Sequence, residues 1–405
     1  LAGAGRRHSH GALLFVDLDR FKPINDIYGH HTGDRVLQEV ARRLVACTRH
    51  EDLVGRLGGD EFVILLPHLD VDRLRAATVA QHVLQVISQP FLIDALEISL
   101  SPSIGISFYP EHSVDVGGLI HAADLAMYQV KQSGRSSYQF YSPELDRQAD
   151  EIYSLETRLK DALRHHRLAL HYQPVVDIAD GRLIGVEALV RLADNGILIG
   201  PASFIPVAES TGLIGDIGEW VLWEACRQHE LWREEGMRIP IAVNVSPLQF
   251  KKHDFAETLK QVLVTTGVDP SCIHLEVTES AVMESLGEAI GILRKVKALG
   301  VKIALDDFGT GYSSLSRLAS LPLDKLKVDQ SFVRQIDSDS ASRAVTEAII
   351  TLGRKLKLDV VGEGIESEHA LRYLQAHGCN QAQGNWFSAP LTASQFTQWH
   401  RRHLH

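Results

Sequence analysis

The second half of the chain repeats one pattern: a short apolar run typical of a β-strand, followed by a stretch with helical periodicity. Strands that alternate with helices are typical of a parallel sheet whose helices cross back over it. Seven or eight such strands in about 250 residues predict a (β/α) barrel. The apolar runs are Leu168–Pro174, Leu183–Leu189, Ile239–Val245, Ile273–Val277, Lys302–Leu305, Lys325–Val328 and Asp359–Gly362.

Acidic and amide side chains end or follow these runs, at what would be the carboxyl ends of the strands. Those ends converge around one axis in a barrel, and carboxylates brought that close cannot all ionise without a counter-charge. An all-oxygen set with no His or Cys indicates hard divalent cations, Mg²⁺ or Mn²⁺. A surface salt-bridge network would explain any single member but not the whole set. The set is Glu187, Asn244, Glu276, Asp306, Asp307 and Glu363.

The adjacent pair Asp306-Asp307 is suited to a site with two metals, because one carboxylate can bridge ions about 3.5–4 Å apart, as in phosphodiester hydrolysis. Lys327 also falls at a strand end, where it would orient a water molecule or offset phosphate charge. The residues alone therefore indicate a site for hard divalent cations, with a carboxylate pair of the kind used in two-metal phosphodiester hydrolysis.

The first half has a different, α+β pattern of hairpins and helices. Leu53–Leu66 indicates a strand, a turn at Gly58-Gly59 and a second strand, since glycine tolerates the positive φ of tight turns. Further strands are expected over Ala12–Val16 and Glu97–Phe108, and helices over Asp34–Cys47, Val71–Ser88 and Val116–Lys131. Ser142–His166 predicts one charged helix that begins near Pro143.

We therefore expect two domains, which suits 405 residues. The boundaries are 1–141 for the first domain, 142–166 for a linker helix and 155–405 for the second domain. No apolar run is long enough to span a bilayer, so we expect no membrane contact within this segment and a cytoplasmic location. The first residue is not Met, and we expect a fragment of a longer protein, in which N-terminal sensory or membrane regions remain an open alternative. A net charge of −10 argues against a polymeric nucleic-acid partner.

In the first half, Gly58-Gly59-Asp60-Glu61-Phe62 places two carboxylates beside a glycine turn. The simplest interpretation of this segment alone is a solvated hairpin. With Asp17 at the end of the first strand, the same carboxylates would hold a metal, and Lys22 would meet phosphate. Both interpretations stay open on the residues alone.

The second half resembles the EAL-domain cyclic di-GMP phosphodiesterases over roughly residues 155–400. The resemblance is carried by an ordered set of motifs, which is specific only as a set. The motifs are Glu187-Ala188-Leu189 with Arg191, Asn244-Val245-Ser246, Glu276-Val277-Thr278-Glu279, Asp306 to Gly311, Lys327-Val328-Asp329, Glu363-Gly364-Ile365-Glu366 and Gln383-Gly384. One departure is Asn385-Trp386, where family members often carry an aromatic residue directly after the glycine.

The resemblance implies hydrolysis of cyclic di-GMP to linear pGpG with two Mg²⁺ or Mn²⁺ ions. Glu187, Asn244, Glu276 and Asp306 would bind one ion, and Asp306, Asp307 and Glu363 the other. Lys327 would position the attacking water, and Glu279 would brace the loop after Asp307. The implied substrate contacts are Gln173, Arg191, Glu366 and Gln383.

Residues 10–141 resemble the GGDEF diguanylate cyclase domains, without the helix and Asp-x-Leu-Thr-Gly-Leu stretch that usually open the family, so we expect an N-terminally truncated domain. The shared pieces are Asp17-Leu18-Asp19 with Phe21-Lys22, Asn25-Asp26, Gly29-His30, Gly33-Asp34, the Gly58–Phe62 segment, Asp124, Met127-Tyr128, Lys131 and Gly134-Arg135. The resemblance implies binding of GTP with Mg²⁺ and a homodimer, because each domain would present one GTP.

By this resemblance Asp17 and Asp60 would hold Mg²⁺, and Glu61 would assist metal binding or deprotonation of the 3′-hydroxyl. Asn25 and Asp34 would contact guanine, and Lys22, Lys131 and Arg135 would contact phosphates. Arg49 and Asp52 match the family's Arg-x-x-Asp inhibitory site, which binds the product.

Three functions remain in competition. The first is a phosphodiesterase that also makes cyclic di-GMP or binds GTP. The second is a receptor that binds cyclic di-GMP or GTP without turnover and signals through its linker helix. The third is net synthesis. Retention of Glu187, Asp306, Asp307 and Lys327 favours the phosphodiesterase, since a receptor is expected to have lost metal ligands.

Overall fold

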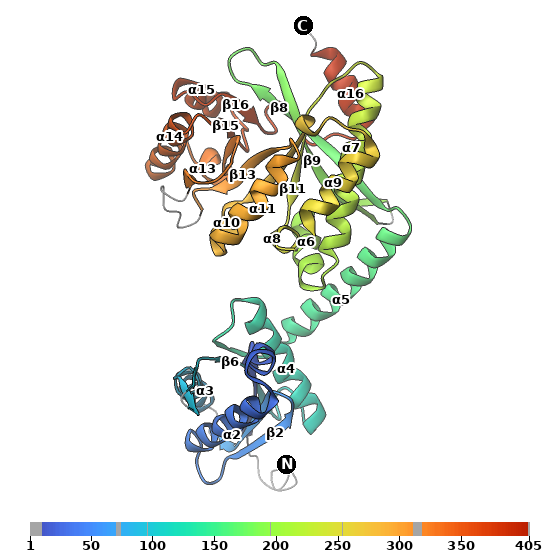
Figure 1. Cartoon of the computed structure of the whole chain (residues 1–405). Helices are drawn as coiled ribbons and strands as arrows, with labels where there is room; N and C mark the ends of the chain where they lie inside the picture. Colours follow the sequence, from blue (N-terminus) through green and yellow to red (C-terminus); the bar gives the residue numbers. More distant parts are fainter. Residues whose placement is uncertain are drawn as a thin grey trace. The chain divides into compact units, whose positions relative to one another are not determined.

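The computed structural model describes residues 10–69, 74–94, 96–194, 196–252, 254–310 and 318–403. The chain divides into two compact units, Leu1–Tyr153 and Ser154–His405 (Figure 1). Within the described ranges, none of the helices combines the length and the apolar character that crossing a membrane requires.

The first unit is built on a five-stranded sheet with strand order β2-β3-β1-β6-β7. Its pairs are antiparallel except β6 with β7, which is parallel. The elements in chain order are β1 (His10–Asp19), α1 (Phe21–Tyr28), α2 (His30–Ala46), β2 (Leu53–Gly58), β3 (Glu61–Leu69), α3 (Leu74–Ile87), β4 (Phe91–Ile93), β5 (Leu96–Ile98), β6 (Ser101–Tyr109), α4 (Val116–Gln132) and β7 (Tyr138–Phe140).

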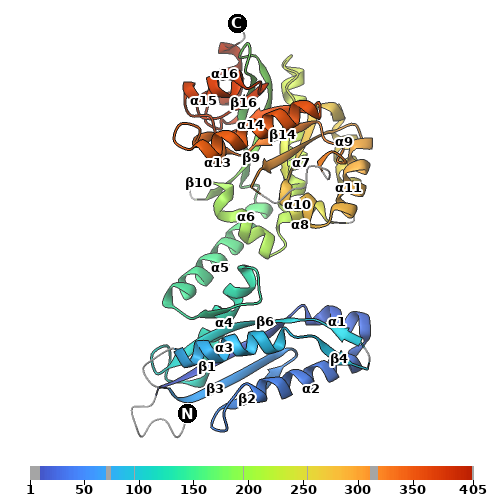
Figure 2. The same cartoon turned by 90° about the vertical axis from the view of Figure 1, so that its left-hand side faces the viewer.

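Both faces of this sheet are covered because β1 is apolar on both sides. Leu14 and Val16 belong to the core shared with α2 and α3, whereas Leu13 and Phe15 pack with residues of α4. Figure 2 labels these helices and the strands of the sheet. Helix α4 approaches β6 closely at Gly105, where an added Cβ would lie 1.8 Å from the carbonyl oxygen of Ala123. The sheet therefore accepts α4 at this distance only because position 105 has no side chain.

Helix α5 (Pro143–Arg164) follows β7 and crosses the boundary between the two units. Leu145 in its first half is buried within the first unit, and Leu159 and Ala162 in its second half are buried within the second unit.

The second unit is a closed barrel of eight strands, in the order β9-β11-β12-β13-β14-β15-β16-β8, with β8 paired back to β9. Its elements are β8 (Leu168–Asp177), β9 (Leu183–Asp194), β10 (Ile197–Ile199), α6 (Pro201–Ser210), α7 (Ile214–Glu234), β11 (Ile241–Val245), α8 (Pro247–Phe250), α9 (Phe255–Thr266), η2 (Pro270–Cys272), β12 (Ile273–Thr278), α10 (Glu279–Glu284), α11 (Leu286–Ala298), β13 (Lys302–Phe308), β14 (Lys325–Val328), α13 (Gln330–Arg334), α14 (Ser340–Lys355), β15 (Asp359–Gly362), α15 (Glu368–Ala376), β16 (Gln381–Gln383) and α16 (Ala393–Arg402).

The expected fold classes, an α+β domain followed by a (β/α) barrel, are confirmed. Two details differ from the sequence analysis. Strand β8 is antiparallel to both β9 and β16, because the short turn from β8 to β9 has no room for a crossover helix. Strand β16 was not expected, since Gln381–Gln383 is only three residues long and has no apolar run.

We predict that Gly105→Ala destabilises the first unit by about 1–3 kcal/mol, because the new methyl group must push α4 away from the sheet. Urea unfolding and scanning calorimetry of the full chain measure the effect. Gly55→Ala in β2 is the matched control, since its Cβ would meet only a Val63 methyl group, at 3.4 Å. Equal stability of the two variants would contradict the packing described for α4.

Candidate active site

The expected oxygen donors of the second unit gather at the carboxyl ends of the barrel strands. Asn244 lies beside Glu276 on neighbouring strands, and Thr278 at the end of β12 pairs with Asp306 on β13. Glu363 follows β15 directly, and Gln383 ends β16. Because parallel strands end at the same rim, residues far apart in sequence become neighbours here.

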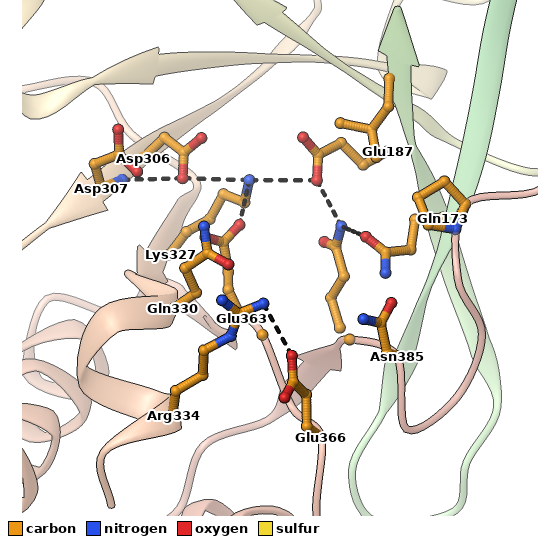
Figure 3. Close-up of a pocket in the computed structure, with 15 residues that line it drawn as sticks. Gln173, Glu187, Asp306, Asp307, Lys327, Gln330, Arg334, Glu363, Glu366 and Asn385 are labelled. Atoms are coloured by element: carbon orange, nitrogen blue, oxygen red, sulfur yellow. Dashed lines mark hydrogen bonds and ion pairs between the residues drawn. The ribbon is translucent and has the colours of Figure 1, made fainter. Parts of the chain in front are cut away.

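The ammonium group of Lys327 is the centre of this cluster (Figure 3). Its Nζ lies 2.5 Å from Glu363 Oε1, 2.7 Å from Glu276 Oε2, 3.3 Å from Asp306 Oδ1 and 3.7 Å from Glu187 Oε2. The side chain is 2% exposed. Burial opposes its charged form, but the surrounding carboxylates outweigh burial and raise the pKa of Lys327 well above the ordinary lysine value.

The carboxylates are crowded enough to compete for protons. Burial, together with Asp306, raises the pKa of Glu363 well above its usual range. Burial raises the pKa of Glu276 to about 8 and that of Asp307 to about 6, with neighbouring carboxylates adding to both shifts. One ammonium group therefore does not neutralise the cluster. Without further cations, some of the carboxylates must bind protons.

Glu187 behaves differently because it has more donors. Burial favours its neutral form, but Lys327 and the amide groups of Gln383 and Asn244 outweigh burial and lower its pKa. Asn244 Nδ2 donates to Oε1 at 2.6 Å, and Gln383 Nε2 donates to Oε2 at 2.5 Å. Glu187 is thus held ionised and fixed in orientation.

Oxygen atoms of Asp306, Asp307 and Glu363 lie within 4.8 Å of one another, which suits one hard cation. Lys327 joins Glu187 and Glu276 to Asp306 and Glu363 of this trio. Asn244 adjoins them through its hydrogen bond to Glu187. The structure therefore brings together all six expected oxygen donors and Lys327, and the donor set fits Mg²⁺ or Mn²⁺.

Asp307 has a left-handed backbone with φ of 54°, which is uncommon for a residue other than glycine. Glu279 contacts the turn that follows Asp307. It is the first residue of α10, and it is 2% exposed. Gly309 N–H donates to Glu279 Oε2 at 2.9 Å, and Thr310 Oγ1 donates to the Asp307 carbonyl at 2.8 Å. Glu279 thus lies where it can fix the Asp307 turn. Gly311 of the expected motif lies outside the described residues.

A cavity of about 300 Å³ opens above the cluster. It is lined by the expected residues Gln173, Glu187, Asp306, Asp307, Lys327, Glu363, Glu366 and Gln383. Gln383 Nε2 also donates to Gln173 Oε1 at 3.0 Å, which joins these two amides into one wall. Arg191 is placed differently, because its guanidinium group donates to the Val190 carbonyl and it does not line this cavity.

The sequence analysis did not single out Gln330 and Arg334, which also line the cavity. They are four residues apart on α13, and their helical spacing after Asp329 is the signal that would have found them. Asn385, noted only as a departure from the family motif, lines the cavity as well.

A second polar layer lies below the cluster, also unexpected. Lys325, His274 and Gln381 stand two residues before Lys327, Glu276 and Gln383 on the same strands, so they face the same interior. Lys325 Nζ donates to Gln381 Oε1 at 2.9 Å, and His274 Nε2 is buried without a partner. Burial, with Lys325 nearby, lowers the pKa of His274 to about 3, so this imidazole is neutral.

In the first unit, Asp17 at the end of β1 pairs with Glu61 across the sheet, and Asp60 lies beside it. Lys131 Nζ lies 2.8 Å from Asp17 Oδ2. Burial raises the pKa of Asp17, and Lys131 partly opposes that shift. The structure thus brings together Asp17, Asp60, Glu61 and Lys131.

Arg135 lies 3.8 Å from Asp19, a carboxylate that Ser101 and Ser103 also bind. Gly33 packs α2 against the Asn25 side chain, where an added Cβ would lie 1.9 Å from Asn25 Oδ1. Asn25 therefore lies beside Gly33 in the first turn of α2. The residue after Gly33 is Asp34, which is exposed. Lys22 is exposed on α1.

The Arg49–Asp52 segment is a tight turn in which Arg49 N–H donates to Asp52 Oδ2 at 2.8 Å. Arg75 on α3 donates to the other oxygen of Asp52 at 2.7 Å. Sequence reasoning missed Arg75, because nothing in the local pattern links it to residues more than twenty positions earlier.

Comparison with known proteins gives two family matches. A model described as "EAL domain" matches residues 156–390, and one described as "Diguanylate cyclase, GGDEF domain" matches residues 1–137. The bifunctional diguanylate cyclase/cyclic di-GMP phosphodiesterase MucR of Pseudomonas aeruginosa is 45% identical over 387 residues, which are 95% of this chain and 56% of MucR. The cyclic di-GMP phosphodiesterase PdeR of Escherichia coli is 38% identical, over 97% of this chain and 59% of PdeR. The chain thus spans somewhat over half the length of these relatives.

Solved structures are similar to the second unit. The phosphodiesterase of PaMucR in complex with c-di-GMP is 44% identical, with a TM-score of 0.59, and the match covers 60% of this chain and 99% of that one. An EAL domain protein from Listeria monocytogenes is 31% identical, with a TM-score of 0.55, over 61% of this chain and 98% of that one.

We predict that Mn²⁺ raises the melting temperature of the chain more at pH 8 than at pH 6. Glu276 and Asp307 bind protons more tightly in the folded chain than in the unfolded chain, because folding raises their pKa values. The metal-free fold therefore loses stability as the pH rises towards 8 and these groups lose their protons. The metal binds the deprotonated ligands, and protons compete with it less as the pH rises through the pKa values of Asp307 and Glu276. Scanning calorimetry with and without Mn²⁺ measures the shift.

The control for this experiment is Asp307→Asn, which removes a negatively charged ligand and should shrink the shift at pH 8. A shift that does not depend on pH, or that the variant retains in full, would contradict the assignment of this cluster as a metal site.

Proposed function

The chain belongs to the EAL domain family and carries a GGDEF domain ahead of its EAL domain, and on that basis we propose that it turns over cyclic di-GMP. The EAL domain, residues 155–405, hydrolyses the cyclic dinucleotide to linear pGpG. Residues 1–141 form the GGDEF domain, and the helix at residues 142–166 links the two. One observation carries the assignment: six oxygen donors and a buried lysine converge at one rim of a closed barrel.

In this proposal Glu187, Asn244, Glu276 and Asp306 hold one divalent cation, and Asp306, Asp307 and Glu363 hold the second. Two such cations supply an activated water and offset the negative charge of the phosphate. The donor set supports Mg²⁺ or Mn²⁺, because every ligand is an oxygen atom and four of the carboxyl groups belong to one buried cluster.

The remaining side chains orient the reaction. Lys327, kept protonated by its carboxylate neighbours, donates a hydrogen bond to the attacking water. Glu279 fixes the turn that presents Asp307. Gln173, Gln383 and Glu366 line the cavity in positions to contact the dinucleotide, and Arg191 would contact it after leaving its carbonyl partner.

We also propose that the GGDEF domain binds GTP with Mg²⁺ and joins two GTP molecules in a homodimer. Asp17 and Asp60 hold the ion, and Glu61 assists it or deprotonates the 3′-hydroxyl. Lys131, which pairs with Asp17, would contact the phosphates of GTP. Lys22 and Arg135 contact phosphates, and Asn25 and Asp34 contact guanine. Arg49 and Asp52 form a product-binding inhibitory site, together with Arg75, which donates to Asp52.

We predict that Glu187→Gln lowers kcat for cyclic di-GMP hydrolysis by about 100-fold or more, because it removes a charged ligand from the first cation site. Chromatography of pGpG formed in Mg²⁺ or Mn²⁺ measures it. Glu257→Gln, at an exposed position of α9, is the matched control and should keep full activity. If the unmodified chain binds cyclic di-GMP tightly but forms no pGpG, the hydrolase proposal is wrong and the receptor alternative holds.

In the Glu187→Gln background, GTP and Mg²⁺ should yield cyclic di-GMP that accumulates, because its breakdown is blocked. Adding Asp60→Asn should abolish the accumulation, whereas Glu97→Gln on exposed β5 should not. The rate per chain should rise with chain concentration, since two GGDEF domains must meet. Absence of cyclic dinucleotide at every concentration would contradict the proposed synthesis.

A further inference from the structure

The outer wall of the active-site cavity carries an ion pair between Glu366 and an arginine, Arg334, to which no role has been given. Arg334 Nη2 on α13 lies 2.9 Å from Glu366 Oε1, on the loop that follows β15. Both side chains line the cavity, and they are 49% and 52% exposed. In the view of Figure 3 the pair lies across the cavity from Asp306 and Asp307. We propose that Arg334, with Glu366, recognises one guanine base of the bound dinucleotide, an inference that rests on the proposed function.

The backbone holds this wall in place. Gly364 has φ of 64°, and an added Cβ there would lie 2.6 Å from Gln330 Cβ, so α13 packs directly on the loop after β15. Ile365 N–H donates to the Gln383 carbonyl at 3.1 Å, and Trp386 N–H donates to the Ile365 carbonyl at 2.9 Å. The two loops and α13 therefore form one unit that presents Arg334, Glu366 and Asn385 to the cavity.

The distribution of charge favours Arg334 as the group that meets a ligand. Among the described residues that line the cavity, the cations are Lys327 and Arg334. Lys327 is enclosed by carboxylates, whereas Arg334 has one partner and is half-exposed. An ion pair at that level of exposure contributes roughly 0–1 kcal/mol, so a ligand can open it at little cost.

Guanine matches the two members of this pair. Its O6 and N7 atoms accept hydrogen bonds and suit the fork of an arginine, which is the commonest specific contact to guanine. Its N1–H and exocyclic amine donate, which suits a carboxylate. Adenine has an amine in place of O6 and an acceptor at N1, so it opposes both groups. The cations would meanwhile hold the phosphate on the other side of the cavity, which leaves Arg334 free for the base.

The test is isothermal titration calorimetry of the full chain with cyclic di-GMP and with cyclic di-AMP, in Ca²⁺ to slow turnover. An Arg49→Ala background removes product binding at the proposed inhibitory site. Arg334→Gln and Arg334→Lys should each weaken cyclic di-GMP binding by about 10- to 100-fold, because both remove the guanidinium fork. Binding of cyclic di-AMP should change by less than about threefold, so the preference for guanine collapses. Arg227→Gln, on α7 outside the cavity, is the control.

An equal loss for both dinucleotides would overturn the inference and assign Arg334 to the phosphate. Unchanged binding in Arg334→Gln, or a full guanine preference in Arg334→Lys, would overturn it as well. The proposed hydrolysis is judged separately, by pGpG formation in Mg²⁺. An inactive chain whose guanine preference depends on Arg334 overturns the hydrolase alone, and an active chain whose preference does not depend on Arg334 overturns base recognition alone. A chain that binds neither dinucleotide overturns both.

Discussion

The attraction between the Lys327 ammonium group and four carboxylates is the interaction on which the top of the barrel depends. Carboxylates this close would repel one another strongly, and a buried ion without a partner is costly. Lys327 reduces both penalties, but it carries one positive charge against several negative ones. Burial, together with this excess of negative charge, raises the pKa values of Glu276, Asp307 and Glu363. The rim where a phosphodiester would bind thus keeps an excess of negative charge, which favours the binding of cations.

The scaffold fixes these side chains through contacts that the reaction itself does not use. Asp307 keeps its left-handed conformation because Glu279 and Thr310 hold the turn around it. Gly364 and Gly384 allow backbone segments to approach each other where any side chain would collide. Such positions are worth keeping only if the geometry they impose matters, which is why strain and close packing gather at functional sites.

The sequence predicted this rim well, because one rule links strand ends in sequence to a common place in space. Glu187, Glu276, Asp306 and Glu363 each end or follow an apolar run, and parallel strands bring those ends together. The same rule gave no warning that β8 runs antiparallel, since the direction of a strand leaves no mark on its own residues. It also missed β16, a three-residue strand that begins and ends with glutamine and therefore has no apolar run. Arg75 lies on α3, and only tertiary packing brings it to Asp52.

A second polar layer lies below the carboxylate cluster in the barrel interior. Barrel interiors are usually filled by branched apolar side chains, yet Lys325, His274 and Gln381 occupy this one. Burial lowers the pKa of Lys325, while Asp359 and Glu276 oppose that shift. The hydrogen bond from Lys325 to Gln381 fixes the position of the lysine side chain below Glu276. His274 stays neutral beside it and adds no repulsion. The carboxylate rim therefore lies above one lysine, one neutral imidazole and one amide. These residues form no motif, because they are spread over three strands and share only their distance from the rim.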